Sequence, residues 1–391
     1  MDFLLLSTLY LTVFIILTYV LWFGDSSFHR RGYVGKLRRT IITGSRWCFH
    51  HCLPSLLRRQ VENLWQYAAY TRNPLFQCLY AILVLAGFST FQLDVLHYAA
   101  LYEAPTLPLY QKLPLYILCV NAVLFCALSL GDPGVIVKRN VERHLKLYEF
   151  DGQLYRQDEQ CRTCQFEKPA RSKHCAFCNH CVYRFDHHCL WVNCCIGGLN
   201  HRLFLGFLIS LCCLCGYISY ATWKVALLIV EANKLWSAHY VDRYGRPQPM
   251  DLRTLCQYLF MQHPRMIFLL VSLSLLTVLL VGFTLYHLYL TLNNVTTNEL
   301  YKKPARQQQH QQHQQQQHQL QQQQQQHDKN NTFKGKGSQP KMKQRKQLLE
   351  ETRQRKTKFA VQSQCHRWNP YHRGYFQNIF EVLWPLTSRR L

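Results

Sequence analysis

Long apolar stretches alternate with basic, polar stretches along the 391 residues of this chain. A helix needs about 20 apolar residues to cross the hydrocarbon core of a membrane. Five stretches meet this requirement, and we predict membrane spans at 3–23, 74–97, 113–131, 203–230 and 266–292. The second span is the weakest because Gln92 and Asp94 lie near its end. The pattern predicts an α-helical polytopic membrane protein with about five transmembrane helices.

The first apolar stretch, 3–23, carries no charged residue and has two interpretations. A secretory signal peptide begins with positive residues and ends at a cleavage site of small residues. The stretch shows neither feature, and it is longer than the apolar part of a signal peptide. We therefore predict a retained helix, with a cleaved signal peptide as the alternative.

The charges between the spans predict the orientation of the chain. The chain has 45 Lys and Arg against 21 Asp and Glu, a net charge of +24, and nine of the cations lie in 24–73. Segments 132–202 and 293–391 are also basic. Segment 98–112 contains only one cation, Lys112, and segment 231–265 contains both basic and acidic residues. Positive loops face the cytosol, which places 231–265 in the lumen. This accounts for the net charge without nucleic acid. Attraction of the basic loops to anionic lipid is a second interpretation.

The segment after the fifth span contains two distinct parts. Residues 307–327 are almost entirely Gln and His, and a Lys-rich stretch continues to Lys358. We predict a disordered linker over 307–358, which is passive or binds metal weakly through its histidines. Within 366–385, five apolar residues have the spacing of one helix face: Phe376, Ile379, Phe380, Leu383 and Trp384. This face would pack on the cytosolic segment 132–202 or lie in the membrane interface.

Segment 132–202 concentrates side chains that bind metals. Eight of the 18 cysteines fall between Cys161 and Cys195, beside several histidines. Zinc is commonly held by four Cys or His ligands that come from short Cys-x2-Cys turns, and thiols stay reduced in the cytosol. The segment is poor in aliphatic residues, so that bound zinc would supply much of its folding free energy. It offers more than the eight ligands that two zinc ions require.

The surplus residues indicate possible chemistry. Asp186, His187 and Cys189 form a short acid, imidazole and thiol series. Imidazole can take the proton of a thiol, and the thiolate is a nucleophile, while a carboxylate fixes the imidazole tautomer. The spacing alone does not establish a triad. A purely structural zinc module remains the alternative from composition.

Residues 161–200, with Asp-His-His-Cys at 186–189 followed by Trp191, Asn193 and Cys195 to Gly197, resemble the DHHC-type protein S-acyltransferases, or palmitoyltransferases. Further segments match elements of that family: Asp132-Pro133-Gly134, Thr296-Thr297-Asn298-Glu299, and Asn369-Pro370-Tyr371 through Asn378. Residues 148–151 and 168–175 are similar to one vertebrate subgroup of it.

The resemblance implies a role for each residue of the motif. The fold would combine the transmembrane helices with a small cytosolic zinc-stapled DHHC cysteine-rich domain. One structural zinc ion would be held by Cys161, Cys164, His174 and Cys181, and the other by Cys175, Cys178, His188 and Cys195. Cys189 would be the acylated nucleophile, His187 its base, and Asp186 the residue that orients His187.

The implied reaction transfers a fatty acyl group, palmitoyl by expectation, from acyl-CoA to cysteines of cytosol-facing proteins. Membrane lipid, the acyl-CoA co-substrate and these proteins are the expected partners, in the endoplasmic reticulum or Golgi. Arg171, Lys173, Arg184 and Arg202 would meet the CoA phosphates or form a solvated rim. The alternative is a non-catalytic membrane-anchored zinc-binding interaction module. A nucleic-acid-binding finger is disfavoured because the ligand order of a Cys2His2 finger is absent.

The sequence departs from the family pattern at two positions. Leu190 follows the nucleophile where the family often has Pro, which removes a backbone constraint but no chemical group. Cys194 stands where Asn is common, which leaves the last zinc ligand ambiguous between Cys194 and Cys195. The family register favours Cys195. Cys194 would then be a bystander thiol or a secondary acylation site.

Overall fold

The computed structural model describes residues 3–26, 28–29, 32–102, 107–152, 154–241, 244–302 and 369–386. The predicted linker 307–358 lies outside the described residues. The chain divides into two compact units. The helical unit comprises Met1–Ser129, Leu190–Asn193 and Phe207–Gly282, and the cysteine-rich unit comprises Leu130–Cys189, Cys194–Gly206 and Phe283–Leu391.

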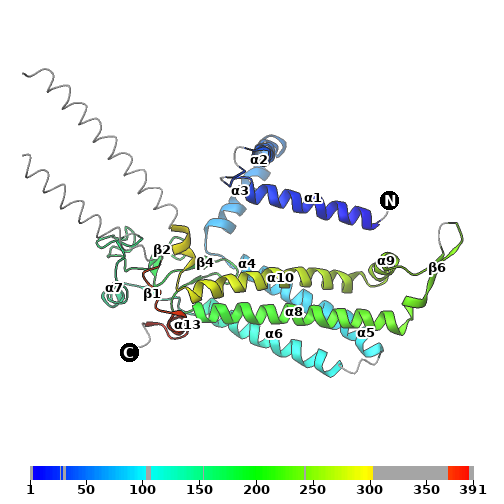
Figure 1. Ribbon diagram of the computed structural model, residues 1–391. Coiled ribbons are helices and arrows are strands. Elements are labelled where there is room, and N and C mark those ends of the chain that lie inside the picture. Colours follow the sequence, from blue (N-terminus) through cyan, green and yellow to red (C-terminus); the bar gives the residue numbers. More distant parts are fainter. Residues whose placement is uncertain are drawn as a thin grey trace, which may run out of the picture. The chain divides into compact units, whose positions relative to one another are not determined.

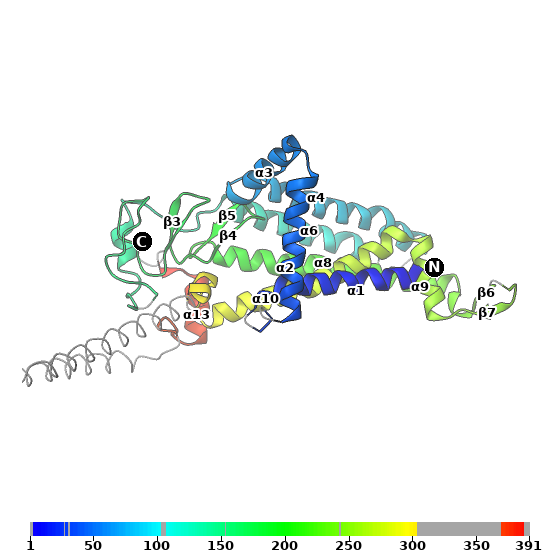
Figure 2. The same cartoon turned by 90° about the horizontal axis from the view of Figure 1, so that it is seen from above.

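Among the described residues, four helical segments are long and apolar enough to cross a membrane (Figures 1 and 2). The first is Leu75–Leu101, built from α4 (Leu75–Thr90), η1 (Phe91–Val95) and α5 (Leu96–Leu101). The others are Pro108–Leu130 within α6 (Leu107–Leu130), α8 (His201–Ala232) and α10 (Pro264–Leu292). The class of a multi-pass α-helical membrane protein is thus confirmed. The first predicted span forms α1 (Phe3–Phe23), and its insertion in the membrane stays a prediction.

The two polar residues that weakened the second predicted span lie in the π-helical turn η1. Asp94 there is mostly buried, and its Oδ1 accepts a hydrogen bond of 2.8 Å from Nη2 of Arg265 on α10. Pairing with an opposite charge reduces the cost of an acid near an apolar helix. The helical segment extends past the predicted limit at residue 97 and ends at Leu101.

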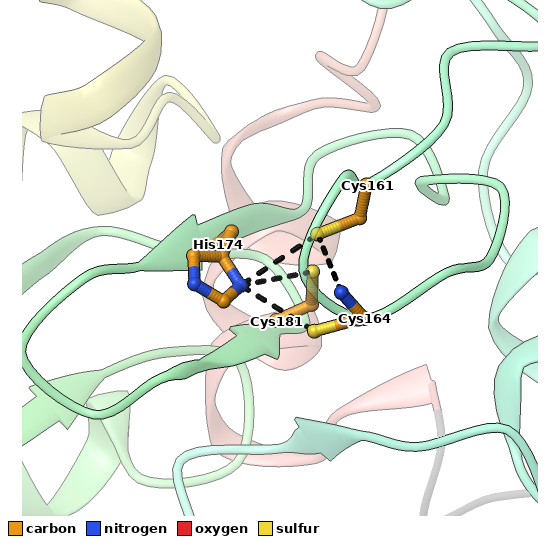
Figure 3. A group of neighbouring side chains, drawn as sticks. All are labelled: Cys161, Cys164, His174 and Cys181. Atoms are coloured by element: carbon orange, nitrogen blue, oxygen red, sulfur yellow. Dashed lines mark hydrogen bonds between the residues drawn. The ribbon is translucent and has the colours of Figure 1, made fainter.

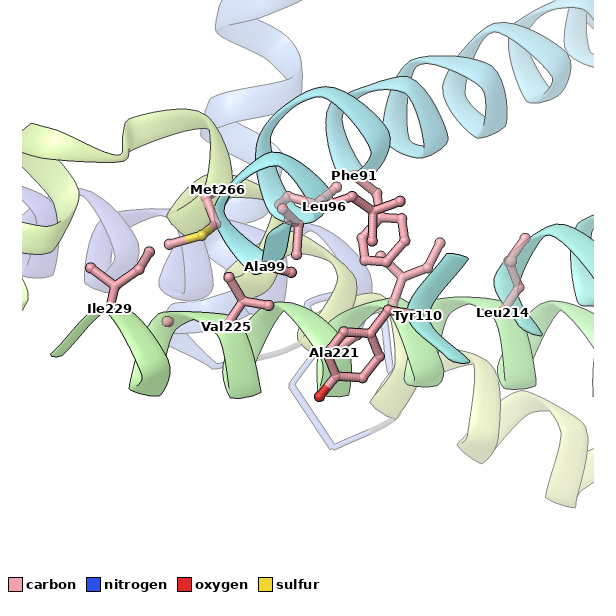
Figure 4. Packing of buried hydrophobic residues seen from close by; sticks show 13 residues of the cluster. Phe91, Leu96, Ala99, Tyr110, Leu214, Ala221, Val225, Ile229 and Met266 are labelled. Carbon is pink, nitrogen blue, oxygen red and sulfur yellow. The ribbon is translucent and has the colours of Figure 1, made fainter. Parts of the chain in front are cut away.

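The core of the helical unit lies along one face of α8. Residues of this face recur every three or four positions, as an α-helix requires: Leu214, Ile218, Ala221, Val225 and Ile229. They pack against Phe91, Leu96 and Ala99 and against Tyr110 and Met266, and Figure 4 labels all of these residues except Ile218. Elements η1, α5, α6, α8 and α10 thereby share one apolar cluster.

A buried asparagine adds a polar contact between these helices. Asn121 of α6 donates to Oγ of Ser210 on α8 at 2.8 Å and accepts a hydrogen bond from Tyr80 of α4. Hydrogen bonds between membrane helices contribute about 0.6 kcal/mol on average. Asn121 therefore links three helices at a modest gain in stability.

The polar segments between the spans contain secondary structure that was not predicted from the sequence. Segment 24–73 includes α2 (Tyr33–Cys52) and α3 (Ser55–Tyr70). The predicted luminal loop contains η2 (Leu235–Ser237), the hairpin β6–β7 (His239–Val241 and Pro247–Pro249) and α9 (Leu252–Gln262).

The cysteine-rich unit is built from very short strands. Its three-stranded sheet has the order β1 (Val135–Ile136), β3 (His180–Val182), β2 (Lys173–Cys175), and α7 (Val141–Leu145) follows β1. A separate antiparallel hairpin joins β4 (His187–Cys189) to β5 (Cys194–Ile196).

A pair of glycines allows the backbone after β5 to approach its neighbours closely. A Cβ atom on Gly197 would lie 2.4 Å from the carbonyl oxygen of Pro133, and one on Gly198 would lie 2.2 Å from the ring of Tyr183. No larger residue fits at either position without displacing the backbone or the tyrosine.

The tail segment forms helix α13 (Tyr375–Leu383). Its apolar face was predicted either to pack on segment 132–202 or to lie in the membrane interface. Phe376, Phe380 and Trp384 of the predicted apolar face are exposed, whereas Asn378 and Glu381 are buried. Asn378 Nδ2 donates to the carbonyl oxygen of Leu292 at 2.7 Å. The expectation that the apolar face packs on the cysteine-rich segment is wrong, because polar contacts hold the opposite face. Its location in the membrane interface stays a prediction.

Candidate metal centres and active site

The first cysteine and histidine cluster comprises Cys161, Cys164, His174 and Cys181. Nδ1 of His174 lies 3.6, 3.4 and 3.9 Å from the sulfur atoms of Cys161, Cys164 and Cys181 (Figure 3). One ring N–H donates to one acceptor at a time. Three sulfur atoms around a single ring nitrogen are therefore the arrangement of a coordination sphere.

The second cluster repeats this arrangement with Cys175, Cys178, His188 and Cys195. Nδ1 of His188 lies 3.7, 3.4 and 3.6 Å from the three sulfur atoms, and the sulfur atoms of Cys195 and Cys178 are 3.5 Å apart. In each cluster all four ligand atoms lie within 4.8 Å of one another.

These distances fit a tetrahedral metal ion. With Zn–S of about 2.3 Å and Zn–N of about 2.0–2.1 Å, tetrahedral angles place neighbouring nitrogen and sulfur ligands roughly 3.6 Å apart. The observed nitrogen–sulfur distances of 3.4–3.9 Å surround this value. Both clusters can therefore bind a metal, and three thiols with one imidazole are a donor set typical of structural zinc.

Strand geometry explains why the two ligand sets interleave in sequence. His174 and Cys181 are partners across β2 and β3, and both belong to the first cluster. The next residue, Cys175, belongs to the second cluster. Successive side chains of a strand point to opposite faces, so adjacent residues serve different metal sites.

The same alternation separates metal ligands from catalytic candidates in hairpin β4–β5. His188 lies opposite Cys195, and both belong to the second cluster. His187 and Cys189 flank His188 and therefore point to the other face, where Cys189 lies opposite Cys194. The structure groups Cys195, and not Cys194, with the metal-binding residues.

The predicted acid–imidazole pair is formed. Asp186 is 2% exposed, and its Oδ2 accepts a hydrogen bond of 2.7 Å from Nδ1 of His187. The backbone N–H of Thr297 donates to Asp186 Oδ1 at 2.6 Å, and the Thr297 hydroxyl donates to Oδ2 at 3.0 Å. Burial alone would raise the pKa of Asp186, but these hydrogen bonds and the nearby imidazoles hold the pKa below its ordinary value. The carboxylate is thus ionised and fixes the proton of His187 on Nδ1.

His187 has the electrostatic surroundings of a strong base. Burial lowers its pKa, but hydrogen bonds to Asp186 and Cys189 outweigh burial and raise the pKa to about 9. Its side chain keeps 26% of its surface exposed, so that the ring remains reachable. The arrangement can take the proton of the Cys189 thiol and hold it as imidazolium.

Two further histidines, which were not among the predicted site residues, lie near His187. The ring centroid of His287 on α10 is 5.9 Å from that of His187, and the ring of His201 on α8 is 6.4 Å from His287. The ring of Phe204 packs edge-on against both His187 and His287. For His287 the signal was present in the sequence, because an ionisable side chain inside a predicted membrane helix usually has a function; His201 lies just before the predicted span 203–230.

A buried ionic cluster contains Arg171 and Arg184, two of the four residues that were predicted to meet the CoA phosphates or to form a solvated rim. Arg171 is fully buried, and its guanidinium contacts both carboxylate oxygens of Glu299 at 2.7 and 2.9 Å. Arg184 is also buried and lies 3.8 Å from Glu381 of α13. Asn294 accepts a hydrogen bond from each of the two arginines, at 2.9 and 2.8 Å. For Arg171 and Arg184 both expectations, binding of CoA phosphates and a place in a solvated rim, are therefore wrong, because the two guanidinium groups are buried and face acidic residues inside the protein.

The fold and these sites define a class: multi-pass membrane proteins in which a cysteine, an imidazole and a carboxylate adjoin two Cys/His metal sites. A family model described as DHHC palmitoyltransferase matches residues 154–304. The palmitoyltransferase ZDHHC4 of Mus musculus is 36% identical over 302 residues, which are 77% of this chain and 85% of the mouse protein. The protein of the same name from Bos taurus is 34% identical and covers 79% of this chain and 88% of its own length. The palmitoyltransferase SWF1 of Yarrowia lipolytica is 35% identical over 47% of this chain and 46% of its own length.

The chain therefore belongs to the DHHC palmitoyltransferase family. The predicted enzyme class, a protein S-acyltransferase, is confirmed.

Proposed function

We propose that the chain transfers a long fatty acyl group, palmitoyl by preference, from acyl-CoA to cysteines of other proteins through a thioester on Cys189. The observation that supports this most strongly is the Asp186–His187 hydrogen bond beside the Cys189 thiol. Such a series generates the thiolate that a thioester exchange requires.

The first step forms the acyl-enzyme. His187 takes the proton of Cys189, and the thiolate attacks the carbonyl carbon of the acyl-CoA thioester. The carbon–sulfur bond to CoA breaks, and the leaving sulfur takes the proton from His187. Asp186 stabilises the imidazolium during this step.

The second step repeats the chemistry with a protein thiol. The cysteine of the substrate protein loses its proton to His187 and attacks the carbonyl carbon on Cys189. The acyl group moves to the substrate, and Cys189 recovers the proton. One thioester replaces another in each step, so that neither step needs ATP.

We propose that the two metal clusters hold structural zinc. Four protein ligands fill a tetrahedral site and leave no position for water or substrate. Zinc at His188 and Cys195 would fix hairpin β4–β5 and thereby the direction in which His187 and Cys189 point.

The membrane would supply the environment of the acyl chain. Each methylene group removed from water contributes about 0.8 kcal/mol, so a long chain prefers an apolar site. The four residues after Cys189, Leu190–Asn193, belong to the helical unit, where Gln77 of α4 donates a hydrogen bond of 3.1 Å to the carbonyl oxygen of Val192. Cys189 is therefore covalently adjacent to a segment that is anchored on a membrane helix.

We further propose that the cysteine-rich unit faces the cytosol, where acyl-CoA and the substrate proteins are available, in the endoplasmic reticulum or Golgi. The basic segments 24–73 and 132–202 support this orientation. Lys173 and Arg202 remain candidates for the CoA phosphates, although Arg202 also donates to the carbonyl oxygen of Leu383 at 3.0 Å.

The experiment compares the wild type with Cys189→Ser and, as a matched control, Cys256→Ser on α9. Each purified protein is incubated with an alkyne-labelled palmitoyl-CoA, and label that hydroxylamine removes is measured. The wild type and Cys256→Ser should carry the label and Cys189→Ser should not. Equal label on Cys189→Ser with unchanged metal content would refute the proposed nucleophile and favour a non-catalytic zinc module.

A further inference from the structure

Cys194 is a thiol to which neither the metal clusters nor the proposed reaction assigns a role. It is the Cα partner of Cys189 in the antiparallel register of hairpin β4–β5. Directly opposite residues of such a pair point to the same face of the hairpin. The nucleophile therefore has a second cysteine as its nearest cross-strand neighbour.

The distance between opposite positions suits a disulfide. Opposite Cα atoms in an antiparallel pair are about 4.5 or 5.5 Å apart, depending on the hydrogen-bonding position. Disulfides join residues whose Cα atoms are about 4.4–6.8 Å apart. Opposite Cβ atoms are about 4.5–5.5 Å apart, against about 3.5–4.5 Å in a disulfide. A small local closure of the hairpin is sufficient at either hydrogen-bonding position.

The surroundings of Cys194 favour a disulfide over acylation. Cys194 is buried, and its sulfur atom lies 3.7 Å from the carbonyl oxygen of Gly131 and 3.4 Å from that of Cys195. Nδ2 of Asn200 is 4.0 Å from the same sulfur atom. A fatty acyl chain on this sulfur would need space among these groups, whereas a bond to Cys189 adds no atoms.

Cys195 cannot take this role without loss of the metal site. It points to the opposite face of β5, into the cluster with His188. A link between Cys189 and Cys194 leaves both metal-binding sets intact. A disulfide between Cys189 and Cys194 would therefore block the nucleophile and leave the metal-binding residues in place.

We propose that Cys194 is a resolving thiol that forms a reversible disulfide with the nucleophile Cys189 under peroxide. This inference rests on the proposed role of Cys189. The Cys189 thiolate attacks hydrogen peroxide, the O–O bond breaks, and a sulfenic acid and hydroxide form. The Cys194 thiol then attacks the sulfur of the sulfenic acid, the S–O bond breaks, and water leaves as the disulfide forms. The enzyme is inactive until a reductant restores both thiols.

The test uses the full-length zinc-loaded protein in lipid nanodiscs, treated with hydrogen peroxide and then with N-ethylmaleimide. Leu190 and Trp191 lie between the two cysteines, so digestion with chymotrypsin separates Cys189 from Cys194 and Cys195. We expect mass spectrometry to find the two peptides linked in the wild type and in Cys256→Ser, and separate in Cys194→Ser.

Activity gives an independent readout. After peroxide is removed, a phosphine reductant should restore autoacylation in the wild type. Cys194→Ser should lose activity under the same treatment and recover much less, because its sulfenic acid oxidises further to sulfinic acid. Cys194→Ala with unchanged zinc content repeats the test with a second side chain.

A wild type without linked peptides, or a Cys194→Ser variant that keeps the link through Cys195, would overturn the proposal. Equal recovery of wild type and Cys194→Ser would also overturn it. The mass measurement uses no acyl-CoA. Failure of the proposed nucleophile in the labelling experiment is therefore distinguishable from failure of the disulfide.

Discussion

Asp186 and Thr297 are joined by two hydrogen bonds although 111 residues separate them in the sequence. The backbone amide and the hydroxyl group of Thr297 each donate to a different oxygen of the carboxylate. A carboxylate held at both oxygens has one fixed orientation, and its Oδ2 then determines the position of the His187 ring. The segment after α10 thereby takes part in positioning the proposed base.

Thr297→Val tests this contact, because it removes the hydroxyl group and keeps the branched shape. A hydrogen bond to a charged group contributes about 1.5–3 kcal/mol, and we expect the autoacylation rate to fall roughly tenfold or more. Thr297→Ser should retain most of the rate. An unchanged rate for Thr297→Val, with normal zinc content, would show that the amide hydrogen bond alone positions Asp186.

Metal content tests the two ligand sets. We expect metal analysis of the purified wild type to give two zinc ions per chain, one for each cluster. Cys178→Ser should lose one of them, since a tetrahedral site with three good ligands binds more weakly. Cys194→Ser is the matched control on the opposite face of the hairpin and should keep both. Loss of zinc in Cys194→Ser would contradict the assignment of Cys195.

Arg171→Met tests the buried ionic cluster. Removing one partner of a buried ion pair costs about 3–5 kcal/mol, because the other charge stays buried without compensation. Thermal unfolding in detergent should show a large loss of stability. The control Lys168→Met breaks the more exposed bridge of 3.0 Å to Glu159 and should cost no more than about 1 kcal/mol. Similar losses in the two variants would argue against a special role of Arg171.

Glu381 predicts a specific dependence of stability on pH. Burial raises its pKa, but the charges of Arg184 and Arg171 outweigh burial and lower the pKa from its ordinary value. A lowered pKa in the folded state adds stability at pH values above the ordinary pKa. This contribution is lost as the pH falls through the lower pKa of the folded state.

Unfolding of the wild type and of Glu381→Gln at a series of pH values measures this contribution. The stability difference should be constant at neutral pH and should shrink once the pH falls below about 4.5, the ordinary pKa of Glu. Any loss of metal at low pH affects both proteins equally, because both have the same two Cys/His clusters, and it therefore cancels in the stability difference. A difference that stays constant down to acid unfolding would rule out this linkage.

Short-range patterns in the sequence predicted the helical class and a metal-binding segment, because spans and Cys-x2-Cys turns are local features. The division of the ligands into two sets was implied by the family resemblance. The pairing of Cys195 rather than Cys194 with His188 follows from strand register, which the sequence alone left ambiguous. The burial of Arg171 depends on Glu299, which is 128 residues away. The sequence does not indicate which acidic residue pairs with a given arginine at such a separation. Arg171 and Arg184 were therefore interpreted as surface cations.

The orientation of α13 shows a second limit of pattern reading. Five apolar residues on one face predicted contact with protein or membrane. On the polar side, Asn378 alone was a predicted packing anchor, and the burial of Glu381 beside it was not predicted. Asn378 and Glu381 are buried because backbone and guanidinium groups elsewhere in the chain satisfy them. Helix periodicity identifies two faces but does not state which one meets the protein when the polar face has such partners.

Successive side chains of β4 point to opposite faces of the hairpin, so the function of the Asp-His-His-Cys segment depends on its register with β5. Inserting or deleting one residue before Cys189 would turn His187 toward the zinc and His188 toward the substrate, so that a one-residue indel would exchange the proposed metal ligand for the proposed base. Changes within strand β4 should therefore be substitutions at constant length, and engineered changes of chain length belong in the turn at 190–193.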